Sequence, residues 1–200
     1  MRRPAGFAAL AFAAAAAPTP AAAHLVGMEF GDFYAGSLHL VLAPGYVAAL
    51  AGLALVAAGQ ARETARWMLA ALPAGIGAGI LLAYGAGPLA PEALLIGAAL
   101  AVTGLIGAFA LRMPMLALGS LCAAGGAVLG YANGLAAYEG GVDRLLFALG
   151  VLSAGTVIGT LTIAVASALT DAHRWAPLGA RVASSWIAAI GTIYFAFSLS

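Results

Sequence analysis

Residues 145–169 read LLFALGVLSAGTVIGTLTIAVASAL and contain no charged side chain. About 20 such residues in a helix are enough to cross the hydrocarbon core of a membrane. Five further apolar runs fill most of the remaining chain, at residues 38–58, 67–84, 93–111, 115–133 and 182–199. Hydrophobic residues make up 64% of the 200-residue chain and charged residues only 8%, whereas a soluble domain has about 25% charged residues. The sequence therefore predicts an all-α, polytopic membrane helix bundle with six transmembrane helices.

The few charges between these runs are sorted by sign. Counted from a non-cytoplasmic start, the loops on one side carry the arginines Arg62, Arg66, Arg112, Arg174 and Arg181. The loops on the other side, where Arg144 is the only basic residue, carry the acids Glu29, Asp32, Glu92, Glu139 and Asp143. Basic residues accumulate on the cytoplasmic side of membrane proteins. We therefore expect a multi-pass protein of the bacterial inner membrane, with both ends of the mature chain in the periplasm.

The first residues form a separate segment. Met1-Arg2-Arg3 is followed by an alanine-rich apolar stretch, and small residues suited to a cleavage site stand at positions 21–23. This order is typical of a secretory signal peptide. It predicts a signal peptide at 1–23 and one six-helix transmembrane domain at 24–200, with His24 as the mature amino terminus. The alternative is an uncleaved amino-terminal anchor, which leaves residue 24 outside the cytoplasm as well.

Glycines recur at intervals of four inside the apolar runs: Gly75 and Gly79, Gly126, Gly130 and Gly134, Gly155 and Gly159. Residues four apart share one face of a helix. A face of bare backbone lets a neighbouring membrane helix approach closely, where van der Waals contact drives association. We expect these glycines to mark helix–helix contacts.

The sequence holds no recognisable catalytic motif. It lacks a Gly-x-Ser-x-Gly nucleophile elbow, a His-Glu-x-x-His metal motif and a phosphate-binding loop. The single Cys122 lies inside an apolar run, which excludes a disulfide framework and favours a buried core position. We therefore expect neither an enzyme nor an organic cofactor.

Imidazole and carboxylate groups gather around the start of the first apolar run. His39 follows Glu29 and Asp32, and removal of the signal peptide would let His24 offer its α-amine and ring nitrogen together. Neutral imidazole with carboxylates is a ligand set suited to nickel, cobalt, zinc or copper. The alternative is that His39 only caps its helix at the level of the lipid headgroups.

Residues 36–46, GSLHLVLAPGY, resemble the first-span motif Gly-x-x-His-Pro-x-x-Gly-x-Asp-His of the HupE/UreJ family. These are hydrogenase and urease accessory membrane proteins regarded as nickel permeases. Gly36 and His39 match the motif, while Gly45 and Tyr46 stand where the family has the aspartate and the second histidine. The family also has a signal sequence and a mature chain that opens with histidine, like His24 here.

Residues 129–136, LGYANGLA, resemble the fourth-span motif His-Gly-x-Ala-His-Gly-x-Glu of the same family. Both glycines and the alanine are kept, while Leu129, Asn133 and Ala136 replace the two histidines and the glutamate. Glu92 lies at the entrance of the third run, where the family commonly has a glutamate. The asparagine is either a weaker oxygen ligand or a hydrogen-bond partner for another helix.

The resemblance implies a permease or binding protein for nickel or a similar divalent transition metal. The metal-contacting residues that we expect are His24, Glu29, Asp32, His39, Glu92 and Asn133, with Tyr46 as a further oxygen donor. Nickel and cobalt are favoured as the transported ion over zinc and copper. The alternative is a degenerate relative that carries no metal and serves as a membrane scaffold or as a subunit of a larger complex. The expected partners are the lipid bilayer, the ion, and other membrane subunits or copies of the chain, without nucleic acid.

Overall fold

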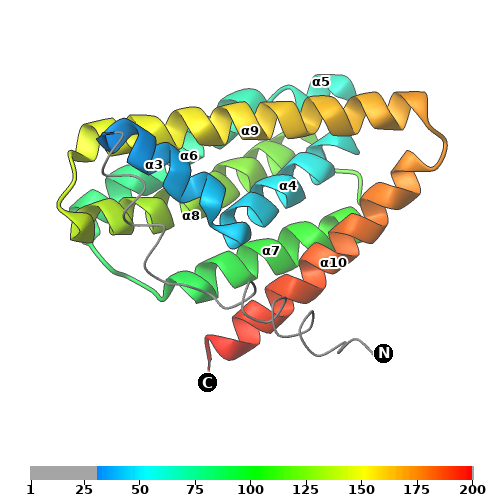
Figure 1. Ribbon diagram of the computed structural model, residues 1–200. Helices are drawn as coiled ribbons and strands as arrows, with labels where there is room; N and C mark the ends of the chain where they lie inside the picture. The colour runs from blue at the N-terminus through cyan, green and yellow to red at the C-terminus, as the bar shows by residue number, and fades with distance from the viewer. Residues whose placement is uncertain (1–30, 200) are drawn as a thin grey trace, which may run out of the picture.

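The computed structural model describes residues 31–199 as a bundle of helices, with no strand in that range (Figure 1). In chain order the helices are α3 (Asp32–Leu42), α4 (Pro44–Ala58), α5 (Arg62–Ala65), α6 (Met68–Ala86), α7 (Glu92–Ala108), α8 (Met115–Gly140), α9 (Arg144–Ala172) and α10 (Ala176–Phe197). The all-α prediction is confirmed for this part of the chain. The expected signal peptide at 1–23 lies outside the described residues.

Four helical segments are long and apolar enough to cross a membrane alone: Arg62–Ala86, α8, α9 and α10. The bent pair α3 and α4 makes a fifth if it is counted as one broken span. Helix α7 is apolar but has 17 residues. At about 1.5 Å per residue it is about 26 Å long, short of a hydrocarbon core of about 30 Å. The chain is therefore a multi-pass membrane protein with four to five candidate spans of full length among residues 31–199, and the six expected spans are confirmed only in part.

The first apolar run, residues 38–58, is not a single helix. Helix α3 ends at Leu42, α4 begins at Pro44, and the two meet at an angle of 73°. Proline has no N–H to donate to the preceding turn, and its ring drives the residue before it into extended backbone. Ala43 has that conformation, with φ −87° and ψ 108°. Pro44 therefore divides the first predicted span into two helices.

Glycines bring the long helices into backbone contact, as their spacing predicts. On α6, a Cβ atom added at Gly79 would lie 2.0 Å from the carbonyl oxygen of Ala127 on α8, and one added at Gly130 would lie 2.0 Å from that of Ile76. Helices α3 and α9 are joined in the same way through Gly36 and Gly150. Membrane helices commonly approach this closely where small residues line their interface. Helices α7 and α10 meet through Gly97 and Gly191, where an added Cβ atom would lie 2.6 Å from the Phe195 nitrogen and 2.3 Å from the Ala101 nitrogen. We call α6–α8, α3–α9 and α7–α10 the glycine-lined pairs.

Helix α4 runs through the middle of the bundle. It contacts α3, α7, α8, α9 and α10, and every residue from Gly45 to Ala58 is buried or half-buried, with Leu50, Leu53 and Val56 among the buried ones. Cys122 of α8 belongs to the same apolar core and is fully buried, as the sequence predicts. The polar residues of the candidate site lie around the start of this central helix.

Charged loops collect at the two ends of the bundle. At one end Arg62 of α5 pairs with Asp171 of α9, and Arg112 donates to the carbonyl of Gly59. At the other end the main-chain N–H of Asp143 donates to the Asp32 carboxylate. Loops that the charge pattern assigned to the same side of the membrane thus lie together.

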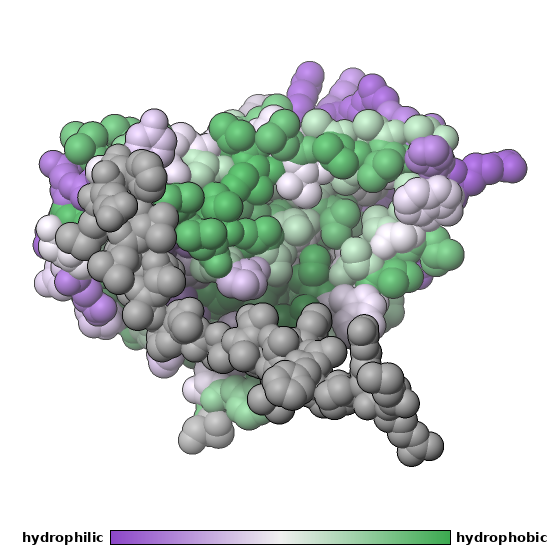
Figure 2. Space-filling model, viewed as in Figure 1, coloured by the Kyte–Doolittle hydropathy of each residue, from purple (hydrophilic) through white to green (hydrophobic). Residues whose placement is uncertain are grey.

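The surface between these ends is apolar. Figure 2 shows hydrophobic residues over most of the middle of one face, with hydrophilic residues at its left edge and upper right. Large exposed apolar side chains from four helices contribute to this surface, including Leu81, Leu116, Leu161 and Trp186. Apolar surface on this scale needs a membrane or a partner to cover it.

Candidate functional site

The candidate site lies at the break between α3 and α4. The end of α3 leaves main-chain carbonyls without partners in the helix, and the start of α4 leaves main-chain N–H groups. In membrane transporters, broken helices of this kind commonly contribute to ion and substrate sites. His39 is in the last turn of α3, and Tyr46 is in the first turn of α4.

His39 is held by both of the helices that it faces. Gly36, one turn earlier, packs directly on the main chain of Phe147 in α9. This close approach brings the His39 ring against the Phe147 ring, and the two ring centroids are 5.9 Å apart. On the other side, Nδ1 of His39 is 2.9 Å from Oδ1 of Asn133 on α8.

The bond to Asn133 determines which nitrogen of His39 is free. Asn133 is fully buried, and its Nδ2 donates to the carbonyl oxygen of Leu129 at 2.8 Å. A carbonyl can only accept, so the amide nitrogen must face Leu129 and the amide oxygen must face His39. Nδ1 of His39 therefore donates, and Nε2 keeps its lone pair. Metal-binding histidines are typically oriented by a hydrogen bond of this kind on the other ring nitrogen.

Tyr46 and Glu92 form a second polar pair beside the break. The hydroxyl of Tyr46, which is buried, donates to Oε1 of Glu92 at 2.6 Å. Glu92 is the first residue of α7 and is exposed. A cavity of about 360 Å³ opens here, lined by residues of α4, α7 and α10 that include Tyr46, Glu92 and Tyr194.

The two pairs are adjacent but not joined by a hydrogen bond. The rings of His39 and Tyr46 are 5.8 Å apart and tilted by 43°. Asn133, His39, Tyr46 and Glu92 thus follow one another from the buried middle of α8 to the cavity. We call these four residues the polar chain.

The other predicted metal ligands, His24, Glu29 and Asp32, do not belong to the polar chain. Asp32 is seven residues before His39, about 10 Å along the helix axis, and its carboxylate accepts from the Asp143 main chain at 2.9 Å. His24 and Glu29 lie outside the described residues. Among residues 31–199, no three His, Cys, Asp or Glu side chains gather closely enough to hold a metal ion. The predicted ligand set is therefore only partly assembled, through His39, Asn133 and Glu92.

Sequence reasoning gave no role to two aromatic residues near the site. Phe147 packs against the His39 ring, as described above. Tyr131 is buried on α8; its hydroxyl donates to the Gly87 carbonyl at 2.9 Å and accepts from the main-chain N–H of Leu89. Tyr131 thereby fixes the loop that leads to Glu92. The only feature of the sequence that could have pointed to Tyr131 is its position within the glycine-rich segment of α8.

Residues 11–194 match the sequence profile of the family described as HupE / UreJ protein. The chain belongs to the HupE/UreJ family. No curated protein and no solved structure matches it. Membership indicates a metal-related accessory protein of the membrane.

Three residues of the polar chain, His39, Tyr46 and Asn133, stand at positions where the resembled HupE/UreJ motifs have histidine, and Leu129 stands at a fourth such position. His39 keeps the family residue, whereas Tyr46, Asn133 and Leu129 stand where the motifs have histidine. The fold brings all four positions together, because Asn133 bonds both His39 and the Leu129 carbonyl and Tyr46 lies against the His39 ring. Of the four positions where the resembled motifs have histidine, this chain has a histidine only at His39.

Proposed function

We propose that this protein takes up nickel, cobalt or a similar divalent transition metal from the periplasm through the polar chain. The observation that carries the proposal is the state of His39. Its Nδ1 is bonded to Asn133, and in the neutral imidazole its Nε2 then offers a lone pair to a metal ion beside the broken helix. Neutral imidazole suits nickel, cobalt, zinc and copper, and selectivity among them depends on geometry and metal supply.

Glu92 and Tyr46 would supply oxygen ligands at the mouth of this path. Their bond places a carboxylate on the wall of the cavity next to the break. We assign His24, Glu29 and Asp32 to capture of the ion before it reaches His39. Asn133 acts mainly by orienting His39, because its oxygen is already bonded to that ring.

The proposed setting is the bacterial inner membrane. A signal peptide of 23 residues is removed, residues 24–200 form one domain with six crossings, and both ends of that domain face the periplasm. In this arrangement the short α7 and the broken α3–α4 pair each count as a crossing. Intact mass of the purified protein should show a chain that begins at His24. We propose no catalytic activity.

Metal accumulation in cells tests the proposal. At scarce external nickel or cobalt, deletion of the gene should lower accumulation of the metal, and His39→Ala should reproduce the deletion. His173→Ala is the matched control, because His173 is exposed and stacks on Trp175 away from the polar chain. Equal accumulation in the deletion, the His39 variant and the parent, with each protein verified in the membrane, would exclude uptake through this site.

Asn133 provides a finer test of the same site. Asn133→Leu removes the acceptor for Nδ1 of His39, whereas Asn133→Asp keeps an oxygen there. Loss of such an orienting partner typically weakens metal affinity about 10–100-fold. We expect a loss of that order with leucine and a smaller one with aspartate.

The second candidate function is a scaffold or subunit of a membrane complex. It is favoured by the single imidazole in the polar chain and by the lack of a three-ligand cluster in residues 31–199. In that case, loss of the chain would destabilise a co-purifying membrane protein at any metal supply. Metal accumulation would then be the same in the parent and in His39→Ala.

A further inference from the structure

The end of the bundle opposite the polar chain contains a cavity of about 370 Å³ with a basic lining. It lies between the ends of α4, α7, α9 and α10. Three arginines line it, Arg62, Arg112 and Arg181, against one carboxylate, Asp171. The cavity therefore carries an excess of positive charge.

Two of these arginines are held in place by a hydrogen bond to the main chain and have further N–H groups that can bind a ligand. Nη1 of Arg112 donates to the Gly59 carbonyl at 2.8 Å, and Nε of Arg181 donates to the Ala108 carbonyl at 2.9 Å. A guanidinium has five N–H groups in a planar fork that suits phosphate. Each of these bonds occupies one of the five, so most of the donors remain for a ligand.

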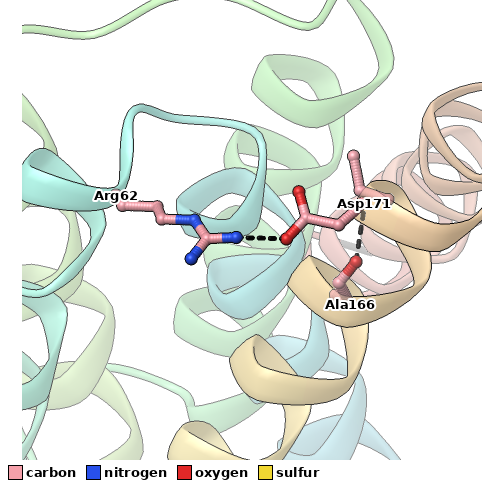
Figure 3. A network of polar contacts seen from close by, with 4 residues as sticks. Arg62, Ala166 and Asp171 are labelled. Atoms are coloured by element: carbon pink, nitrogen blue, oxygen red, sulfur yellow. Dashed lines mark hydrogen bonds and ion pairs between the residues drawn. The ribbon is translucent and has the colours of Figure 1, made fainter.

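Arg62 and Asp171 form the rim of the cavity. Figure 3 shows Arg62, the first residue of α5, reaching to the Asp171 carboxylate near the end of α9. Both side chains are exposed, at 86% and 59%. Salt bridges at such exposure contribute little to stability. Arg62 can therefore exchange this partner for an anion at small cost.

Ser184 adds a neutral donor to the wall. Its residue is 1% exposed and lines the cavity, so its hydroxyl can donate to an oxygen of a ligand there.

A second, apolar cavity of about 420 Å³ continues from the first. The two share lining residues on α4, α9 and α10, among them Leu55, Ala166 and Ala180. Figure 1 shows α10 leaving α9 at a wide angle after the turn between them, and this second cavity lies along that opening. Its α9 wall runs from Leu161 to Thr170, about 14 Å along the helix.

The geometry points to an acidic phospholipid as the occupant of both cavities. The phosphate would lie among Arg62, Arg112 and Arg181, and one acyl chain would lie between α9 and α10 against Val165 and Leu169. A free phosphate would use only the basic part, and a neutral lipid would leave the guanidinium groups without a counter-charge. Basic pockets between helices on the cytoplasmic side recognise acidic lipid headgroups. The arginine side is the one that the charge pattern assigns to the cytoplasm.

Native mass spectrometry of the purified full-length protein tests this assignment. The protein in detergent would be titrated with phosphatidylglycerol, with phosphatidylcholine of the same chain length, and with inorganic phosphate. We expect phosphatidylglycerol to remain bound at lower concentration than phosphatidylcholine. Each basic residue near an acidic headgroup contributes about 1 kcal/mol. Arg112→Gln and Arg181→Gln should therefore each weaken phosphatidylglycerol binding roughly fivefold.

Two matched controls separate this site from general surface charge and from misfolding. Arg174→Gln removes an exposed arginine at the same end that does not line either cavity, and should change little. Ala183→Phe fills the apolar cavity from an exposed position on α10, and should weaken lipid binding while the arginines are intact. Ala189→Phe is its control, exposed on the same helix outside the cavity.

Four results would overturn the assignment, and the first three concern the lipids and the variants. They are equal binding of the acidic and neutral lipids, equal loss in Arg174→Gln and Arg112→Gln, and full phosphatidylglycerol binding by a folded Ala183→Phe variant. Displacement of the lipid by inorganic phosphate at a concentration similar to that of the lipid would also overturn it, because the apolar cavity would then contribute nothing.

Discussion

Replacement of Gly79 by alanine tests whether the α6–α8 contact holds the bundle together. The new Cβ atom would lie 2.0 Å from the Ala127 carbonyl oxygen and 2.7 Å from the Tyr131 nitrogen. Carbon–oxygen contacts are usually about 3.3–3.6 Å. The atoms that close in on Gly79 are main chain, so no side chain can turn aside. The two helices must separate by more than 1 Å.

The cost of this separation follows from the contacts that it loosens. A gap of about 0.5–1 Å removes a quarter to a half of the attraction of an atom pair worth about 0.1–0.2 kcal/mol. If about 40 pairs along the interface are affected, the loss is roughly 1–4 kcal/mol. Alanine also favours the helix over glycine by up to about 1 kcal/mol. We expect Gly79→Ala to lower the free energy of unfolding by the difference between these two contributions.

Gly77→Ala is the matched control on the same helix. Gly77 has no atom within 4 Å of its added Cβ, so the substitution retains only the gain in helix propensity. Both variants would be unfolded by sodium dodecyl sulfate in mixed micelles and followed by circular dichroism. The two free energies of unfolding should differ by roughly 1–4 kcal/mol. Equal stabilities would refute the conclusion that backbone contact at Gly79 sets the distance between α6 and α8.

Three further outcomes are expected. Thr64→Cys should be protected from an impermeant thiol reagent in intact cells while Gly140→Cys reacts, and the opposite labelling would reverse the proposed orientation. Tyr46→His should raise nickel affinity in equilibrium dialysis, because it adds an imidazole beside the His39 ring at a centroid distance of 5.8 Å; unchanged affinity would count against metal binding at the polar chain. Asp143→Ala removes the N-cap of α9, where the Asp143 carboxylate accepts from two main-chain N–H groups. This substitution should lower the free energy of unfolding by about 1 kcal/mol. An unchanged value would show that the cap contributes nothing.

Local sequence signals predicted the helices and several of their contacts. Each apolar run contains a helix, because composition and length decide that in a membrane. Glycines at intervals of four correctly predicted backbone contact through Gly79 and Gly130. The alternative for Asn133, a hydrogen bond to another helix, is confirmed by its bond to His39. These signals depend on residues close together in the chain.

Features that depend on distant parts of the chain were not predicted. Pro44 breaks the first run, yet Pro73 lies inside α6 without ending it, so proline alone does not determine where a helix is interrupted. The basic cavity requires α4, α7, α9 and α10 to place Arg112 and Arg181 on a common wall. Spacing along the sequence contains no information about that arrangement. The same holds for the bond between Tyr46 and Glu92 on separate helices.

The glycine-lined pairs also determine which parts of the bundle can move. Because main chain meets main chain in α6–α8 and in α7–α10, no rotamer change can absorb a shift inside either pair, and each must move as a rigid body. Displacement is confined to the boundaries between pairs, where α4 lies. A tilt of α7–α10 against α6–α8 would carry Glu92 away from Tyr46 and widen the cavity that these two residues line. In the proposed uptake, the hydrogen bond between Tyr46 and Glu92 would then act as the gate.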